Sequence, residues 1–150
     1  MPTLLIHSLF AAAVQCLVNL VMIGQGINEF TFYAAIASIL VDLDHRSDGK
    51  RSSIIHSLVS IFLALAIGVL GVFLLADVWK RLFVSSLTVG FVSHVSIDAT
   101  DSWGIFVTPW KSKVISFFKA LENTRSQGKR RLDLILAILS ASTLLILVLF

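Results

Sequence analysis

The stretch LFVSSLTVGFVSHVSID, residues 82–98, is apolar along most of its length and ends with a histidine and an aspartate. His94 and Asp98 are four residues apart, so on a helix they share one face, with Cβ atoms about 5–6 Å apart. Ionisable groups are expensive inside a membrane, where a charge at the centre of a helix costs about 2.5–3.5 kcal/mol. Another part of the sequence is therefore expected to compensate the cost of burying His94 and Asp98.

The composition of the chain indicates a membrane protein. Its 150 residues are 57% hydrophobic and 14% charged, with a mean hydropathy of +0.92. Soluble domains carry about 25% charged residues, so this chain has too few to cover a wetted surface. Apolar segments occupy residues 4–23, 30–41, 54–76, 82–97 and 132–150. Crossing a bilayer takes about 20 apolar residues, so the second and fourth segments must be extended by their polar ends.

These segments predict an all-α fold: a polytopic membrane helix bundle of about five apolar helices in one membrane-embedded domain, residues 1–150. Residues 1–99 would form a four-helix core and residues 132–150 a C-terminal transmembrane helix. In the polar stretch 100–131, apolar residues recur at helical spacing at Val114, Phe117, Phe118 and Leu121. This pattern predicts an amphipathic helix in the membrane interface, with a soluble amphipathic helix as the alternative.

The basic residues orient the predicted bundle. If the helices alternate in direction, ten of the twelve Lys and Arg lie on the side of the N-terminus, and only Lys80 and Arg81 lie on the other. This asymmetry predicts a multi-pass protein of the cell membrane with a cytoplasmic N-terminus and an external C-terminus. Trp103 and Trp110 are placed like interface anchors, and Trp79 would anchor the opposite side. Basic clusters beside membrane spans favour lipid headgroups over nucleic acid as partners.

In the predicted topology, all four histidines lie on the same side of the membrane as the N-terminus. His7 opens the first segment and His56 the third, while carboxylates and imidazoles close the second and fourth: Asp42, Asp44, His45, His94 and Asp98. Carboxylates at one depth repel one another, and a bound divalent cation removes that cost. Nitrogen and oxygen ligands without thiolate indicate Zn²⁺, with Mn²⁺, Fe²⁺ or Co²⁺ as alternatives. We therefore predict a metal site at the cytoplasmic ends of four segments.

Four motifs in order, TLLIHSL, LVDLDH, RSSIIHSL and SHVSIDATDSWGIFVTP, carry a family resemblance across residues 3–109. Together they resemble the YdjM/DUF457 family of membrane-bound, metal-dependent hydrolases. More distantly, they are similar to the zinc-dependent phospholipase C and P1 nuclease superfamily. That resemblance implies metal ligands at the matching positions: His7, Asp42, His56, His94 and Asp98. The last His-and-Glu ligand group of that superfamily has no counterpart here, which implies one or two metal ions rather than three.

The resulting hypothesis is a hydrolase that uses metal-activated water on a phosphoester of a lipid or headgroup at the cytoplasmic leaflet. Asp44 would serve as general base or would orient a ligand, and His45 would be a ligand or proton donor. Arg51 and Lys50 would hold a phosphate, or else contact lipid headgroups as part of the positive-inside pattern. The serines beside the proposed ligands, Ser57 and Ser93, are expected to donate to ligands or to pack helices.

Two alternatives to this hypothesis stay open, and a third is discounted because its motifs are missing. A non-catalytic membrane protein with a structural metal would usually close its site with four ligands. A metal-ion transporter needs polar groups through the bilayer, and the far halves of the segments offer only six: Gln15, Asn19, Ser60, Ser85, Ser86 and Thr88. That small number favours a one-sided site. A PAP2-type phosphatase also contains HxxxD, but its KxxxxxxRP and PSGH motifs are missing.

Overall fold

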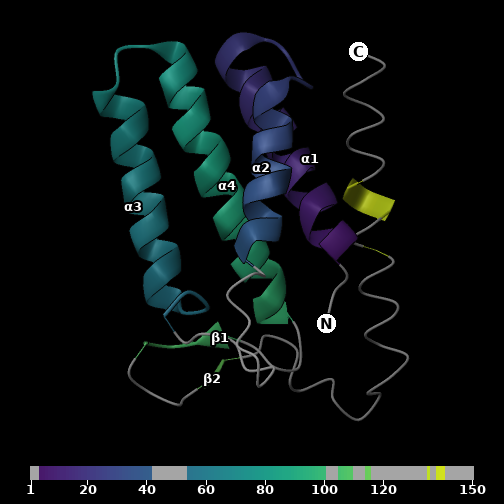
Figure 1. Cartoon of the computed structure of the whole chain (residues 1–150), viewed down its shortest axis with the longest axis vertical. Coiled ribbons are helices and arrows are strands. Elements are labelled where there is room, and N and C mark those ends of the chain that lie inside the picture. The colour runs from purple at the N-terminus through teal and green to yellow at the C-terminus, as the bar shows by residue number, and fades with distance from the viewer. Residues whose placement is uncertain are drawn as a thin grey trace.

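The computed structural model describes residues 4–41, 54–100, 105–109, 114–115, 135 and 138–140. Most of these residues lie in four helices: α1 (Leu4–Ile23), α2 (Glu29–Val41), α3 (Leu58–Leu74) and α4 (Val78–Thr100). Successive helices run in opposite directions, so the starts of α1 and α3 and the end of α4 lie at one end of the bundle (Figure 1). We call this the near end, and the opposite end the far end. The predicted all-α class is confirmed for the described chain.

Two described helices are long and apolar enough to cross a membrane, α1 and the part Val78–Ala99 of α4. The prediction of about five such helices is wrong for the described residues, because α2 and α3 are shorter, with 13 and 17 residues. Helix α3 is shorter than the apolar run 54–76 because its N-cap, Ser57, lies three residues inside that run. Helix α4 continues past its apolar run 82–97 through Asp98 to Thr100, as expected for its polar end, and it also begins earlier, at Val78.

A two-stranded antiparallel sheet lies beyond α4 at the near end (Figure 1). It joins β1 (Ile105–Phe106) to β2 (Val114–Ile115), with Ile105 opposite Ile115 and Phe106 opposite Val114. The predicted interfacial helix is therefore wrong at Val114, which pairs as a strand. Its other apolar positions, Phe117, Phe118 and Leu121, lie outside the described residues, as does most of the predicted C-terminal helix 132–150.

Helix ends in this bundle are set by local side-chain and backbone signals. Helix α1 stops at Gly24, whose φ of +70° is accessible to glycine and whose N–H donates to Leu20 O at 3.0 Å. Asn28 accepts from Phe30 N at 3.0 Å before α2, and Asp77 accepts from Trp79 N at 2.8 Å at the start of α4. Asn and Asp are preferred at such positions because their side chains accept from otherwise unpaired N–H groups.

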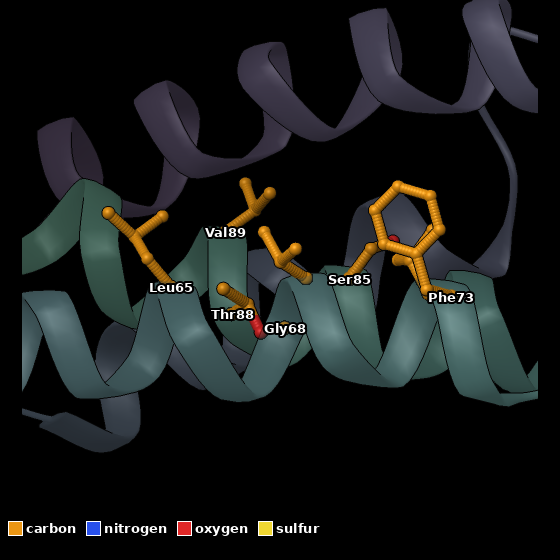
Figure 2. A pocket seen from close by; sticks show the side chains of 8 residues that line it. Leu65, Gly68, Phe73, Ser85, Thr88 and Val89 are labelled. Atoms are coloured by element: carbon orange, nitrogen blue, oxygen red, sulfur yellow. The ribbon is translucent and has the colours of Figure 1, made fainter.

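Helices α1, α2 and α4 pack against one another, and α3 packs against α4. Glycines allow the closest approaches: a Cβ at Gly90 would lie 2.5 Å from Ala34 O on α2, and one at Gly68 would lie 2.6 Å from Thr88 on α4. Close contact through small residues is typical of helices that associate in membranes. A groove of about 200 Å³ remains between α3 and α4, lined mainly by apolar side chains around Gly68 and Thr88 (Figure 2).

Candidate metal centre

Four ionisable side chains from three parts of the chain meet at the near end. His7 comes from the first turns of α1, His56 lies just before α3, and His94 and Asp98 lie in the last turns of α4. All four are buried, with 0–2% of each residue exposed. Alternation of helix direction brings these segments together, as the sequence predicted. This convergence is confirmed for the described members of the predicted set.

Backbone signals around His56 fix its position. The next residue, Ser57, is the N-cap of α3 and forms a capping box with Ser60: Ser60 N donates to Ser57 Oγ at 3.1 Å, and Ser57 N donates to Ser60 Oγ at 3.3 Å. The side chain of Ser60 also donates to Ile55 O. Ser57 thus starts α3, and its Oγ donates to Ile54 O at 3.3 Å. Its expected role as a donor to a metal ligand stays a prediction.

Strand β1 holds the other side of the His56 backbone. Phe106 N donates to His56 O at 2.8 Å, and Ser57 forms a parallel bridge with Phe106. The neighbouring Ile105 is fully buried in an apolar cluster with Val41 of α2 and with Val95 and Ala99 of α4. The sequence reading missed this support, although the apolar run IFV between Gly104 and Pro109 has a strand-like composition.

The carboxylate of Asp98 lies at the centre of the cluster. His7 Nε2 lies 3.7 Å from Asp98 Oδ1, whereas His56 Nε2 and His94 Nε2 lie 3.2 and 3.3 Å from Asp98 Oδ2. The rings of His7 and His94 are stacked, with centroids 4.0 Å apart and an interplanar angle of 21°. The ring of His56 meets that of His94 edge-on, with centroids 5.8 Å apart. Three imidazoles therefore face one carboxylate through the same ring nitrogen.

These separations suit the ligands of a metal ion better than direct hydrogen bonds. Charge-assisted N–H···O bonds are about 2.7–2.9 Å long, and all three N···O distances, 3.2–3.7 Å, are longer. Two ligands about 2.0–2.1 Å from a tetrahedral zinc ion lie about 3.3 Å apart. One ligand atom from each of His7, His94 and Asp98 also fits within 4.8 Å of the others. This buried group can therefore hold a metal ion.

Five of the predicted site residues lie outside the described part of the chain: Asp42, Asp44, His45, Lys50 and Arg51. Their predicted roles as ligand, base or proton donor, and phosphate contacts stay predictions. Helix α2 is described up to Val41, which is 8% exposed and packs with Val95 and Ala99. The end of α2 is therefore anchored against the same turns of α4 that carry His94 and Asp98.

Comparison with known proteins gave no relative: no family model matches the chain, and neither curated proteins nor solved structures gave a match. The resemblance to the YdjM/DUF457 family therefore stays a prediction, and function is argued below from the site.

Proposed function

We propose that the protein is a membrane-embedded, metal-dependent hydrolase whose centre is built on His7, His56, His94 and Asp98. One observation carries this proposal: three imidazole nitrogens surround one buried carboxylate at distances of 3.2–3.7 Å, which match the spacing of metal ligands. These side chains come from segments separated by dozens of residues. Packing of apolar helices does not account for three imidazoles around one buried carboxylate, whereas metal binding does.

The donor set favours zinc, with manganese or iron as alternatives. Neutral imidazole and carboxylate are common zinc ligands, and none of the four residues is a thiolate. Asp98 presents Oδ1 to His7 and Oδ2 to His56 and His94. Such a two-sided carboxylate suits a site for one ion or for two ions bridged by Asp98. Asp42, which follows the last described residue of α2, is proposed as a further ligand.

The proposed chemistry is hydrolysis of a phosphoester. A bound zinc ion supplies a Lewis acid and lowers the pKa of its water to about 7. The histidines and Asp98 bind the ion, and their burial by α1, α3 and α4 fixes their orientation. Asp44 is proposed to accept a proton or to orient a ligand, and His45 to bind metal or to move a proton. Lys50 and Arg51 are proposed to hold the phosphate.

The substrate is proposed to be a lipid or its headgroup, because the bundle has features of a membrane protein. Large apolar side chains cover its outside: on α3, Phe62, Phe73 and Leu74 are 68%, 79% and 78% exposed. At the far end, Trp79 stacks on Phe30 with centroids 5.9 Å apart, as expected of aromatic residues at an interface. The positive-inside pattern assigns the near end, and thus the site, to the cytoplasmic leaflet.

Metal content is the first test of this proposal. Inductively coupled plasma mass spectrometry of detergent-purified protein should find about one or two zinc, manganese or iron ions per chain. The double variant His94→Ala, Asp98→Ala should lose them, whereas Asp77→Asn, which alters a carboxylate at the far end, should retain them. Wild type that stays metal-free after purification without chelator and addition of metal would contradict the proposal.

Substrate hydrolysis is the second test. Metal-loaded protein in mixed micelles should release phosphate or a phosphorylated headgroup from at least one class of lipid phosphoester, and the double variant should not. The full burial of the four side chains also fits a structural metal site. Bound metal that raises the unfolding temperature without hydrolysis across the lipid panel would favour this second candidate.

A further inference from the structure

Two helices carry buried residues at intervals of four that end on the metal ligands. On α1 this series consists of His7, Ala11, Gln15 and Asn19, and on α4 it consists of Ser86, Gly90, His94 and Asp98. All eight residues are buried. Residues four apart lie on one side of a helix in successive turns. Each series therefore runs from the far half of the bundle to the histidine cluster. Both series lie on the buried sides of their helices, toward the space between α1, α2 and α4.

The far half of this interior holds a network of amide and hydroxyl groups. Gln15 Nε2 donates to Asn19 Oδ1 at 2.8 Å and reaches Ser85 Oγ on α4 at 3.4 Å. Asn19 Nδ2 lies 2.7 Å from Asn28 Oδ1 and 3.1 Å from Thr31 Oγ1 on α2. The sequence alone favours a one-sided site, because polar side chains in the far halves are few. In the structure, helix packing turns Gln15, Asn19 and Thr31 toward one another, whereas Ser60 lies at the near end in the capping box of α3.

A further polar group lies between this network and the histidines. Ser38 of α2 is fully buried, and its backbone N would lie 3.0 Å from a Cβ placed on Gly90. Gly90 is one turn from Ser86 and one turn from His94. His7 and Asn19 are twelve positions apart on α1, a rise of about 18 Å along the helix. Polar side chains of α1, α2 and α4 therefore occur at successive levels over this length.

Two of these buried side chains have unsatisfied hydrogen-bonding capacity. Gln15 Oε1 and Ser38 Oγ have no hydrogen-bond partner within the described part of the chain, although both residues are 0% exposed. Buried polar atoms are nearly always paired, so each such atom needs an explanation, such as water or an ion. Both atoms lie along the same interior, between the far end and the histidine cluster. Helix association alone would leave them unexplained.

We propose that the interior of α1, α2 and α4 is a passage by which the divalent cation moves between the histidine centre and the far end of the bundle. This inference rests on the metal centre of the proposed function and is independent of hydrolysis. Neutral oxygens of Gln15, Asn19, Thr31 and Ser38 replace part of the hydration shell of the cation. Intramembrane polar side chains that face a bundle interior commonly mark ion pathways. The close contact at Gly90 requires the helices to separate slightly for each passage.

Zinc flux into liposomes tests this passage. The full chain is reconstituted into liposomes that contain a zinc-sensitive dye, and Zn²⁺ is added outside. Wild type should raise the dye signal faster than protein-free liposomes do. Gln15→Leu should slow this flux by at least about tenfold, because it removes a buried oxygen from the path. It should still bind zinc at the wild-type stoichiometry, since Gln15 is two turns of α1 away from His7.

Thr88→Val is the matched control for this experiment. Thr88 is also a polar residue of α4, but it lies over Gly68 in the groove toward α3 (Figure 2). Its replacement should leave the flux at the wild-type rate. Ser38→Ala is a second path variant in case Gln15→Leu does not fold. Zinc-loaded wild type without flux, or equal flux in wild type and both path variants, would overturn the passage and show that these side chains only join helices.

Cys16 gives an independent readout, because it is the one cysteine of the chain. It is fully buried, with Sγ 3.5 Å from Thr31 Oγ1 in the far-half network. In a hydrated passage, its thiolate attacks a methanethiosulfonate reagent, forming a mixed disulfide and releasing methanesulfinate. Folded wild type should label, and Gln15→Leu should label at least about tenfold more slowly. Labelling of wild type only after denaturation would contradict the passage.

The passage and the hydrolase proposal can fail separately. Zinc flux without lipid hydrolysis would support the passage and remove the hydrolase assignment.

Discussion

Both the near and the far end of the bundle bury polar side chains, but these side chains differ in chemistry. At the near end, three imidazoles surround the carboxylate of Asp98 at 3.2–3.7 Å. At the far end, Gln15, Asn19 and Thr31 contribute amide and hydroxyl groups to the network, with hydrogen bonds as short as 2.7 Å. A neutral amide can be buried when hydrogen bonds pair most of its polar atoms, whereas a buried carboxylate also needs a positive charge nearby. The buried carboxylate thus lies at the near end, where a bound metal ion could compensate its negative charge.

Removal of the central carboxylate should produce the largest difference between the ends. Asp98→Ala should weaken zinc binding by at least about a hundredfold, because it deletes the group that all three histidines face and loss of an outer partner alone costs 10–100-fold. Competition titration with a chelating dye measures this change. Chelator should lower the unfolding temperature of wild type but not of Asp98→Ala. Equal zinc affinity in the two proteins would show that Asp98 is not a ligand.

Loss of the support under His56 should have the next largest effect. Ile105→Ala should reduce the free energy of unfolding by about 3 kcal/mol, because it leaves a cavity beside Val95 and Ala99. It should also weaken zinc binding, because Phe106 N then holds His56 O less firmly. Denaturant titration in detergent and the same chelator competition measure both effects. Phe73→Ala, at an exposed position, should change neither; equal zinc affinity in wild type and Ile105→Ala would contradict this role.

A far-end substitution should destabilise the bundle without changing metal content. Asn19→Ala removes hydrogen bonds to Gly26 O, Asn28 and Thr31. The free energy of unfolding should fall by about 2 kcal/mol, because one buried and two partly buried acceptors lose their donor. Denaturant titration measures the loss, and elemental analysis should find the metal stoichiometry of wild type. A parallel loss of metal would show that the two ends are coupled.

The smallest expected effect is at the cap of α3. Ser57→Ala should cost about 1 kcal/mol of stability, because Ser60 N loses its acceptor at the start of the helix. Ser57→Thr should restore most of that stability, because a threonine hydroxyl accepts the same hydrogen bond. Thermal unfolding of the two variants in detergent makes the comparison. Equal loss in both would point to packing at Ser57 rather than to its hydrogen bond.

Much of the fold and part of the site could be predicted from local signals. The apolar segment predicted at residues 4–23 has the same bounds as α1, because apolar residues fill that range. Convergence of His7, His56 and His94 followed from the alternating direction of helices. Strand β1 could not be predicted from three apolar residues, because so short a run is compatible with either helix or strand. The contact of Gln15 with Ser85 joins residues 70 positions apart and depends on how the helices are rotated, which hydropathy does not specify.

The position of the metal ligands along the chain has a consequence for biosynthesis. Helices α1 and α2 leave the ribosome first, but the central ligand Asp98 and the residue that holds His56 in place, Phe106, emerge much later. Chains fold progressively from the N-terminus during synthesis, at about 5–20 residues per second. In the proposed function, the metal centre is therefore complete only in a chain translated past residue 106. A chain that ends before residue 94 lacks both His94 and Asp98 and is expected to bind the ion weakly.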